Sequence, residues 1–512
     1  MIPTEGIVDL STERPPATMT TEICVIGSGC AGATAARRLA EAGHEVVVLE
    51  EGGDFTGPQL TQRGPEMYDQ LYMDRGGRVT EDAAVSVLQG RVLGGGGVIN
   101  ACDVVPPPDG VLEFWKNKYG LTAFAPENLR PFVQRALNDL GASPDRRSEL
   151  NEANKLLERG AQALGYRGEA MMDNRKGCIG LGACLIGCPA NAKQNPRFVA
   201  IPAAAKAGAR FYTRVRAVNV SGANQELKQI EVRTLDSKGY HERESFTINA
   251  KIVILAANAI GTTHLLLRSG IGNEHVGRHL SLQPQLPVTA QFDQRVEAFT
   301  GIPQSYAITE FEETDNAEHG LWGFRIEGIM GTPGISASLL PQSGLDGKEL
   351  MGHYAHIASA LLLVPDDPIG ELKRTDSARP VIQYRQADDH KDRLRKAIKA
   401  TARAYLAAGA KQVHVPVIPP LQISSEKDLD RVDAIAFAPA TAPLISAHQQ
   451  GGVRFAPSPN QGAADPQGLV YGTRDIYVFD SAGFPSSASS HTMTPIIAVA
   501  HYLSEGLLSK LS

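Results

Sequence analysis

No apolar stretch of this sequence approaches the roughly 20 residues that a membrane-spanning helix needs. The segment 1–21 also lacks the basic block and the apolar block of a secretory signal peptide. These two absences predict a chain without a transmembrane segment. We expect it to be cytoplasmic if it acts alone, or periplasmic if it is exported together with a partner subunit.

Long basic runs are missing as well. The net charge is −6, so the sequence has no electrostatic footprint for nucleic acid. We therefore expect the partner to be a small molecule or another protein. Cysteine is also scarce, because six cysteines in 512 residues are too few for a disulfide scaffold.

The residues that are abundant are those of a globular protein. Hydrophobic residues make up 42% of the chain, and 51 glycines and 32 prolines mark many tight turns between buried segments. A chain of 512 residues is too long for one simple core, so we expect two lobes that share an interface. No internal repeat or low-complexity tract is evident.

The segment 22–50 has the pattern of a βαβ unit that binds a dinucleotide. A short apolar run leads into the motif GSGCAG, and a helix-forming stretch and a second apolar run follow. Such glycines permit a tight turn and a close backbone approach to a pyrophosphate, whose charge the helix N-terminus favours. Glu50, 18 residues beyond the motif, would accept hydrogen bonds from a ribose. The alternative is a glycine turn that serves only helix–sheet packing. The glycines of the motif are Gly27, Gly29 and Gly32.

A second glycine-rich segment, GRVLGGGGVIN at 90–100, favours FAD over NAD. Four consecutive glycines remove all side chains from a loop, which costs conformational entropy. That cost makes sense where backbone must lie against a large flat ligand. A flexible hinge is the alternative interpretation.

From about residue 21 to its C-terminus the sequence resembles the glucose-methanol-choline (GMC) oxidoreductases. The segment 90–100 resembles the first signature of that family, and 258–272 resembles the second. Two positions depart from the second signature, with Asn258 where the family usually has Gly and Thr263 where it often has Pro. Asn tolerates a positive φ better than most residues, so we expect the first change to be harmless. The resemblance is thinnest over 292–432.

Further segments resemble the family in the same order. The segment 213–220 resembles the strand whose backbone meets the adenine, and 478–485 resembles the segment that passes the ribityl and phosphate groups. Glu50 matches the ribose-binding acid of the family, and Ala217 stands at a position often held by Val. The resemblance implies FAD as the cofactor. The residues that it places at FAD are Gly27, Gly29, Gly32, Glu50, Glu51, Arg91, Gly94, Gly95, Gly97, Asn100, Ala217, Asp480, Ser481, Thr492 and Met493.

Two histidines match the positions of the active-site pair of this family. They are His448 in SAHQQGG and His491 in SSHTMTP. Removal of a hydride from an alcohol carbon becomes feasible as the hydroxyl loses its proton, so a neutral imidazole near that oxygen is a suitable base. The resemblance implies His448 as the base, His491 as the partner that orients the alcohol, and transfer of the hydride to flavin N5. The helix after His491 would direct its N-terminus at the flavin.

Half of the cysteines lie in one short loop, where Cys178, Cys184 and Cys188 form C-x5-C-x3-C followed by Pro189. Proline after the last thiolate also occurs in ferredoxin-type sequences, and three thiolates suit a 3Fe-4S cluster. The spacing resembles GMC dehydrogenases that pass electrons through such a cluster to a cytochrome subunit. The long-chain alcohol oxidases of the family also have Cys- and Gly-rich loops here, so structural free thiols or a disulfide remain alternatives. The other cysteines are most simply small buried residues, namely Cys24, Cys30 and Cys102.

The predicted fold class is α/β, with a Rossmann-like FAD-binding lobe and a second α+β substrate lobe built on an antiparallel sheet. The segment 292–364 has short mixed stretches separated by turn residues, as an antiparallel sheet would, and 388–409 reads as an amphipathic helix. The predicted FAD-binding domain comprises 19–110, 196–285 and 440–512. The predicted substrate-binding domain comprises 111–195, with the Cys-rich loop 177–190, and 286–439.

The predicted function is FAD-dependent oxidation of an alcohol to an aldehyde or ketone. We favour a dehydrogenase that passes electrons to a small subunit or a cytochrome, and an alcohol oxidase that uses O2 is the nearest alternative. A non-redox lyase of the same fold and a flavoprotein that serves as an assembly platform are further alternatives. The apolar stretch 357–364 leans toward a bulky or partly apolar alcohol, although such residues could equally form a buried strand.

Overall fold

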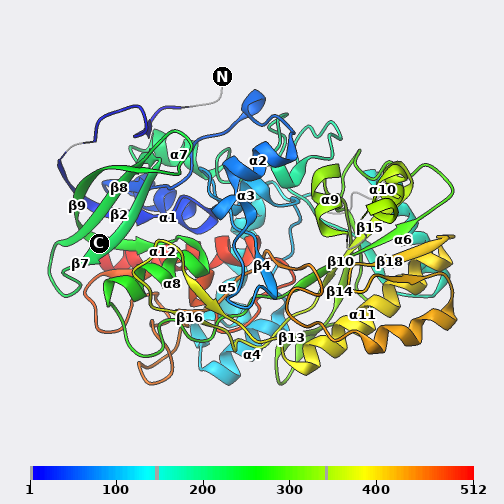
Figure 1. Ribbon diagram of the computed structural model, residues 1–512. Coiled ribbons are helices and arrows are strands. Elements are labelled where there is room, and N and C mark those ends of the chain that lie inside the picture. Colours follow the sequence, from blue (N-terminus) through cyan, green and yellow to red (C-terminus); the bar gives the residue numbers. More distant parts are fainter. Residues whose placement is uncertain (1–3, 16, 144–148, 341–343) are drawn as a thin grey trace.

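The computed structural model describes residues 4–15, 17–143, 149–340 and 344–512, and it places two β-sheets side by side as the centres of two lobes (Figure 1). Each sheet has its own large cluster of buried apolar side chains. Within the described ranges, no helix is both long enough and apolar enough to cross a lipid bilayer. The seam between the two cores holds the cavity described below.

The first sheet, on the left of Figure 1, is largely parallel. All of its strand pairs run parallel except β7 with β8 and β8 with β9, at one edge. The parallel strands are apolar along their length because helices cover both faces of such a sheet. The strand order is β1 (Ile7–Asp9), β6 (Arg210–Thr213), β3 (Val46–Leu49), β2 (Thr18–Ile26), β9 (Glu242–Leu255), β8 (Lys228–Leu235) and β7 (Val215–Ser221), with β21 (Ile476–Val478) paired to β9.

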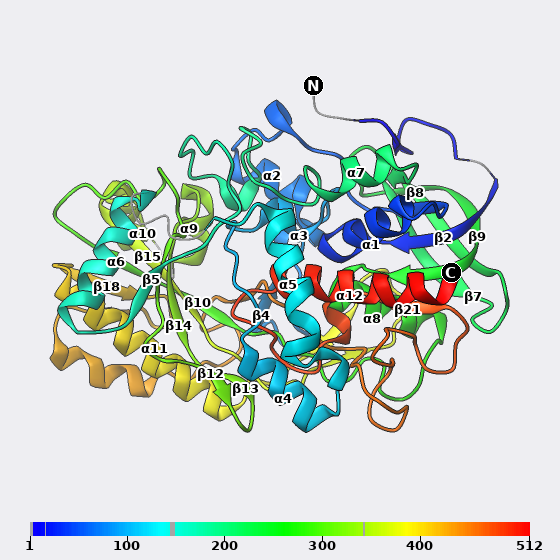
Figure 2. The same cartoon turned by 180° about the vertical axis from the view of Figure 1, so that it is seen from behind.

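Three helices pack together beside this sheet, where α12 (Met493–Leu511) lies against α1 (Cys30–Glu41) and α5 (Pro126–Leu140) (Figure 2). Helix α1 can approach its neighbours closely because its buried face consists mainly of alanines. Helix α12 is buried along most of its length, and its N-terminus opens on the seam between the lobes. The other helices of this lobe are α2 (Gly64–Leu71), α3 (Gly96–Ile99), α4 (Asp109–Tyr119), α7 (Ala200–Lys206) and α8 (Asn258–Ser269).

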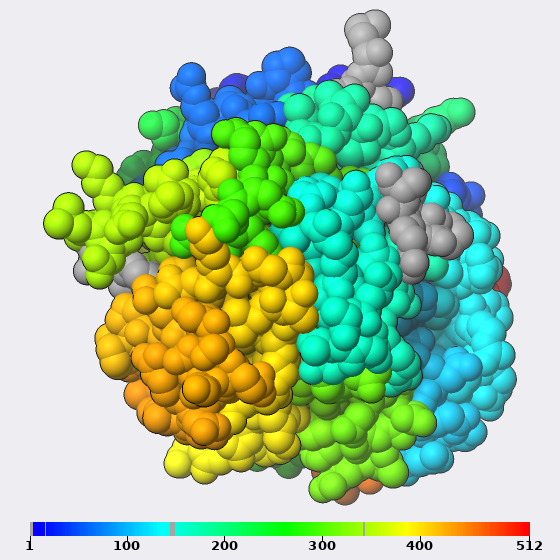
Figure 3. Space-filling model, turned by 90° about the vertical axis from the view of Figure 1, so that its right-hand side faces the viewer, coloured from blue at the N-terminus to red at the C-terminus, as the bar shows by residue number. Residues whose placement is uncertain are grey.

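The second sheet is antiparallel, and its strands pair in a different order from their order along the chain. Helices α6 (Glu152–Ala163) and α11 (Asp388–Ala407) lie side by side over one of its faces (Figure 3). The strand order is β19 (Leu421–Ile423), β18 (Gln412–Val415), β10 (Gln285–Gln291), β15 (Ile357–Leu363), β14 (Arg325–Ile329), β11 (Tyr306–Ile308) and β5 (Gly168–Ala170). Strand β20 (Leu444–Ser446) joins this sheet by pairing with β10 and, in parallel, with β4 (Val85–Val87).

Shorter elements connect the two lobes. Two hairpins stand apart from the sheets, β12 (Glu312–Asn316) with β13 (Gly320–Gly323) and β16 (Glu371–Lys373) with β17 (Val381–Gln383). Helix α9 (Pro333–Leu339) contacts α2 of the first lobe, and α10 (Gly344–Gly352) lies beside α9 (Figure 1). The 3-10 helices are η1 (Gly57–Gln59), η2 (Met73–Gly76), η3 (Thr122–Phe124), η5 (Cys184–Ile186), η6 (Tyr354–His356), η7 (Glu426–Ala434) and η8 (Ser481–Gly483).

The predicted fold class is confirmed: a Rossmann-like α/β lobe is joined to a lobe built on an antiparallel sheet. The predicted domain boundaries stay a prediction, and packing differs from them in two places. Helices α4 and α5, which we assigned to the substrate domain, bury Trp115 and Leu129 in the core of the first sheet. Strands β4 and β20, which we assigned to the FAD-binding domain, pair with the second sheet. An apolar helix face or a short strand does not reveal which lobe it will join.

Candidate active site

A cavity of about 1260 Å³ lies between the two lobes. Part of its lining comes from the turns that follow β2, β3 and β9 of the first sheet, and part from β10 and β15 of the second. The carboxyl ends of parallel strands are where open α/β sheets bind their ligands. This cavity is therefore the candidate site, and both lobes build it.

The glycines of the first motif differ in what they contact. A Cβ at Gly27, whose φ is +103°, would lie 2.3 Å from the carbonyl oxygen of Ala256, and a Cβ at Gly32 would lie 1.9 Å from that of Gly27. Packing alone thus requires glycine at both positions. Gly29 also lines the cavity, but its Cβ would come no closer than 3.8 Å to any neighbour. The protein itself therefore leaves room for a Cβ at Gly29.

The two acidic residues after β3 both have partners within the protein. Glu50 accepts hydrogen bonds from the Oγ of Ser28 at 2.6 Å and from the backbone nitrogens of Ser28 at 3.2 Å and Gly52 at 2.7 Å. Burial raises the pKa of Glu50. Glu51 forms an ion pair with Arg216 at 2.7 Å. Burial would raise the pKa of Glu51, but the nearby guanidinium of Arg216 outweighs burial and the pKa is lowered. Glu50 therefore ties its strand to the glycine turn while it faces the cavity.

The second glycine segment lies directly against the first. The backbone nitrogen of Gly94 donates to the Oγ of Ser28 at 3.0 Å, and a Cβ at Gly95 would lie 2.7 Å from the Cα of Gly29. Gly95 and Gly97 line the cavity, whereas Gly94 packs against Val98 and the backbone of Arg197. Gly96, which we did not predict as a site residue, has no neighbour within 4 Å of its Cβ position and lines the cavity.

The remaining predicted cofactor residues come from distant segments but line the same cavity. Asp480 accepts a hydrogen bond from the Oγ1 of Thr262 at 2.6 Å, and burial raises the pKa of Asp480 to about 6. Thr492 and Met493 form the N-terminus of α12. The residues brought together in this way are Arg91, Asn100, Ala217, Asp480, Ser481, Thr492 and Met493.

Opposite these residues, the two predicted catalytic histidines face each other. The ring centroids of His448 and His491 lie 5.0 Å apart, at 68° to one another. The Nδ1 of His448 lies 2.7 Å from the Oε1 of Gln283 and 2.9 Å from the Nε2 of Gln285. Since Nδ1 is occupied by these amides and His448 lines the cavity, its Nε2 is the atom left for a ligand. Burial lowers the pKa of His448 to about 3, so the ring is neutral at physiological pH.

His491 is held by a carboxylate that the sequence did not single out. Its Nε2 lies 3.0 and 2.9 Å from the two carboxylate oxygens of Glu327, a fully buried residue of β14. Burial would lower the pKa of His491, but the charge and hydrogen bonds of Glu327 outweigh it, and the pKa is raised. Burial likewise opposes ionisation of Glu327, yet His491 and Arg325 lower its pKa to about 2. Glu327 thus favours the protonated form of His491.

Two more groups complete this cluster. Arg325 donates to Glu327 at 2.6 Å and pairs with Glu312 at 3.1 Å and Glu169 at 3.0 Å. A carboxyl oxygen of Asp103 lies within 4.8 Å of a carboxylate oxygen of Glu327 and of a ring nitrogen of His491. Burial raises the pKa of Asp103 to about 8, so its carboxyl is largely protonated at neutral pH. The neutral imidazole of His448, the imidazole of His491, whose protonated form Glu327 favours, and the neutral acid of Asp103 therefore face one end of the cavity.

Comparison with known proteins agrees with this geometry. Family models described as GMC oxidoreductase match residues 68–285 and 369–500, and a model described as FAD dependent oxidoreductase matches residues 22–61. An uncharacterized GMC-type oxidoreductase of Mycobacterium tuberculosis is 30% identical over 513 residues, which cover 99% of this chain and 78% of that protein. This chain belongs to the GMC oxidoreductases. It is an FAD-dependent oxidoreductase that acts on CH–OH groups, as the sequence predicted.

Other similar proteins support the same assignment. The long-chain-alcohol oxidase FAO4B of Arabidopsis thaliana is 27% identical over 507 residues, which cover 95% of this GMC oxidoreductase and 67% of the plant protein. Two solved structures share the fold at low sequence identity. Pyridoxine 4-oxidase from Mesorbium loti has a TM-score of 0.67 at 16% identity, and it covers 96% of this chain and 99% of its own. Formate oxidase of Aspergillus oryzae has a TM-score of 0.66 at 14% identity and covers 97% and 99%.

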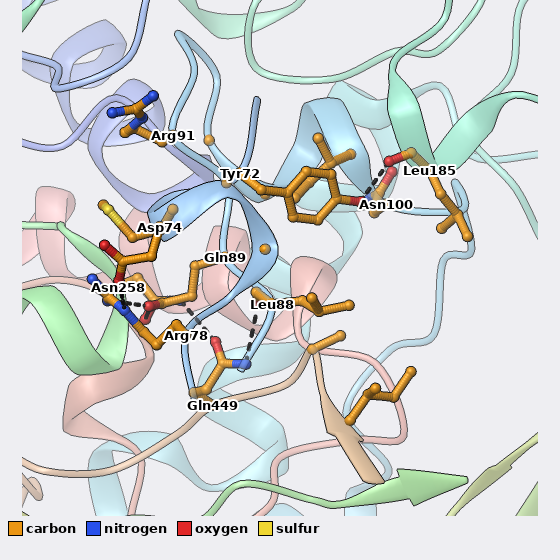
Figure 4. Close-up of a pocket in the computed structure, with 18 of the residues that line it drawn as sticks. Tyr72, Asp74, Arg78, Leu88, Gln89, Arg91, Asn100, Leu185, Asn258 and Gln449 are labelled. Atoms are coloured by element: carbon orange, nitrogen blue, oxygen red, sulfur yellow. Dashed lines mark hydrogen bonds and ion pairs between the residues drawn. The ribbon is translucent and has the colours of Figure 1, made fainter. Parts of the chain in front are cut away.

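The cavity of this GMC oxidoreductase fits FAD. Backbone at Gly29 and Gly96 leaves open space where a side chain would stand. The N-termini of α1 and α12 both open on the cavity, and their partial positive charge suits phosphates and reduced flavin. A wall of polar side chains, Arg78, Gln89, Asn258 and Gln449, joins the two lobes beside this space (Figure 4). Asn258 adopts a φ of +71°, which explains why a glycine in the family can be replaced by Asn here.

The cysteines of the loop differ in exposure. All six cysteines lie within the described residues, and each is a free thiol. Cys178 is exposed, whereas Cys184 turns inward and hydrogen-bonds Cys102; this bond and the nearby Arg175 lower the pKa of Cys184. None of the three loop cysteines lines the cavity. The structure thus gives no support for a 3Fe-4S cluster.

The loop nevertheless contributes to the cavity wall. The hydroxyl of Tyr72 donates to the carbonyl oxygen of Leu185 at 2.5 Å (Figure 4), and Lys193 donates to that of Cys184 at 2.7 Å. Among the residues that we missed, Glu327 has the clearest signal, because RIE at 325–327 places two charges on alternate positions of an otherwise apolar strand. Asp103 and the two glutamines beside His448 carried no such signal.

Proposed function

We propose that this GMC oxidoreductase oxidises an alcohol carbon to an aldehyde or ketone, with His448 as the base and His491 as a charged partner. The observation that supports this proposal most directly is the contrast between the two rings: burial lowers the pKa of His448 to about 3, and Glu327 raises that of His491. A bound FAD would supply the acceptor for the hydride. The Nε2 of His448 would accept the hydroxyl proton while the charge on His491 stabilises the developing alkoxide.

The test of this function is anaerobic reduction of the bound flavin by an alcohol. We expect its visible absorbance to bleach on addition of substrate and to recover with an acceptor. A flavin that no alcohol bleaches would leave the two alternatives predicted from the sequence, a non-redox lyase or an assembly platform.

For the acceptor we propose O2, in place of the dehydrogenase that the sequence favoured. That preference depended on the cysteine loop, in which Cys184 hydrogen-bonds Cys102. One relative is named a long-chain-alcohol oxidase and another a cholesterol oxidase, which favours O2. We expect the reduced enzyme to be reoxidised by air at least as fast as by an artificial acceptor, with formation of hydrogen peroxide. Anaerobically purified protein should contain iron and acid-labile sulfide well below one cluster per chain. A full cluster per chain with slow reoxidation by air would restore the dehydrogenase.

The glycine motif offers a matched pair of variants for the proposed cofactor site. Gly29→Ala fits the protein itself, since its Cβ would approach nothing closer than 3.8 Å, but it would stand where the pyrophosphate must come close. We expect this variant to fold with a near-normal Tm in the absence of FAD and to lose at least tenfold in FAD affinity. Gly32→Ala places its Cβ 1.9 Å from a backbone oxygen and should lower the Tm without FAD. Flavin titration and thermal unfolding of the apoproteins check both, and normal FAD affinity of Gly29→Ala would place the pyrophosphate elsewhere.

A further inference from the structure

The cavity extends past the histidines along one face of the second sheet. Strand β10 contributes Gln285, Pro287 and Thr289 to its lining, and β15 contributes Ile357, Ser359 and Leu361. These are alternate residues of each strand, so they share one face of the sheet. The register pairs Pro287 with Leu361 and Thr289 with Ser359. The floor of this extension is therefore a regular two-strand surface that begins at Gln285, which contacts His448.

The extension has an apolar roof and side wall. Helix α9 covers it with Ile335 and Leu339, followed by Leu340. Pro416, which follows β18, Pro443, which precedes β20, and Ile445 of β20 itself also line it. Among the described residues that α9, β10 and β15 contribute to the lining, none carries a charge. This part of the cavity thus differs sharply from the charged cluster at its other end.

The few hydroxyl groups in this lining already have partners within the protein. The Oγ1 of Thr289 lies 2.9 Å from the Oγ of Ser359, and the Oγ of Ser338 donates to the carbonyl oxygen of Ile335 at 2.8 Å. A polyol such as a sugar needs several unpaired donors and acceptors to replace its hydrogen bonds with water. The extension offers few of them, but it offers a large apolar area.

We infer that the substrate is an alcohol with one reacting hydroxyl and an extended apolar body that lies over β10 and β15 under α9. The floor offers the body a length of about 13 Å, because each of the four steps between the five residues from Gln285 to Thr289 adds about 3.3 Å along the strand. The hydroxyl end lies at the histidines, and the far end lies near Thr289 and Ser359. This inference rests on the proposed alcohol oxidation and adds the class of substrate.

A series of straight-chain 1-alkanols tests this inference on the FAD-loaded enzyme. We expect kcat/KM to rise about fourfold with each added methylene, the gain for burial of one CH2 group, until the extension is filled. A flat dependence on chain length, or a preference for a sugar or another polyol, would overturn the substrate class. In either of those cases the flavin is still bleached, so the proposed function stands; if no alcohol bleaches the flavin, the proposed function fails first.

Two substitutions on α9 make the test specific to this part of the cavity. Leu339→Trp adds a bulky ring to the roof, whereas Ala337→Trp adds it to an exposed residue of the same helix that does not line the cavity. We expect Leu339→Trp to lower kcat/KM at least tenfold for 1-decanol and less than twofold for 1-butanol. Ala337→Trp should leave both values unchanged. An equal effect of Leu339→Trp on both alcohols, or equal effects of the two variants, would contradict a chain-binding role for this surface.

Discussion

Replacement of His448 by alanine is expected to lower kcat by about 10²- to 10⁴-fold, the range that a general base contributes, while the protein keeps its FAD. The ring lies buried, with Nδ1 occupied by Gln283 and Gln285 and Nε2 toward the cavity. Its removal takes away the proton acceptor without touching the glycine segments of the proposed cofactor site. Flavin content by absorbance and steady-state rates with a saturating alcohol check this prediction.

A buried histidine elsewhere provides the control. His390 lies on α11, does not line the cavity, and burial lowers its pKa to about 3 as well. We expect His390→Ala to reduce stability but to leave kcat of the folded, FAD-loaded enzyme within about twofold. Near-normal turnover of His448→Ala would remove His448 from the role of base.

The pH profile gives an independent view of His448. The neutral ring is the form that accepts a proton, and it predominates above its pKa of about 3. The lowered pKa therefore means that base activity is lost only as the pH falls toward 3. We expect no acid limb near the usual histidine pKa in kcat/KM for the free enzyme.

Replacement of Glu327 by glutamine is expected to lower kcat by about 10²-fold and to change the pH profile. Glu327 touches no substrate in the proposal, and it acts as a positioning residue by holding His491 at 2.9 Å. Without its charge, burial and Arg325 would lower the pKa of His491 below the usual value. The charged form of His491 exists below its pKa, so the activity that needs this charge should be lost at a lower pH in the variant. The alkaline limb of kcat should move by at least about one unit toward acid.

The carboxylates around Arg325 supply a matched control for that experiment. Glu169 pairs with Arg325 at 3.0 Å but is more than half exposed and does not contact His491. Glu169→Gln should leave both kcat and the alkaline limb in place. Glu327→Asp should restore part of the rate, because it returns the negative charge. If Glu327→Gln lowers kcat with an unmoved alkaline limb, Glu327 has only a structural role.

The sequence by itself determined the parts of this protein that depend on local stereochemistry. The turn at Gly27 needs a φ of +103° and a close approach to Ala256. Only glycine satisfies both requirements, so the turn can be recognised in the sequence from its glycine motif. The order of the matching segments predicted the family, and with it FAD and the two-lobed fold. The positions of His448 and His491 followed from the same segments, and the structure brings the two rings to 5.0 Å.

Contacts between residues far apart in the chain were decided only by the tertiary structure. Glu327 holds His491 across 164 positions, and neither side chain shows any sign of the other in the sequence. The hydrogen bond between Cys184 and Cys102 is likewise a contact between distant segments. Helices α4 and α5 join the first core in the same way. The physical reason is that hydrophobic period and turn chemistry encode local structure. The charge of a buried imidazole depends on which distant strand packs against it.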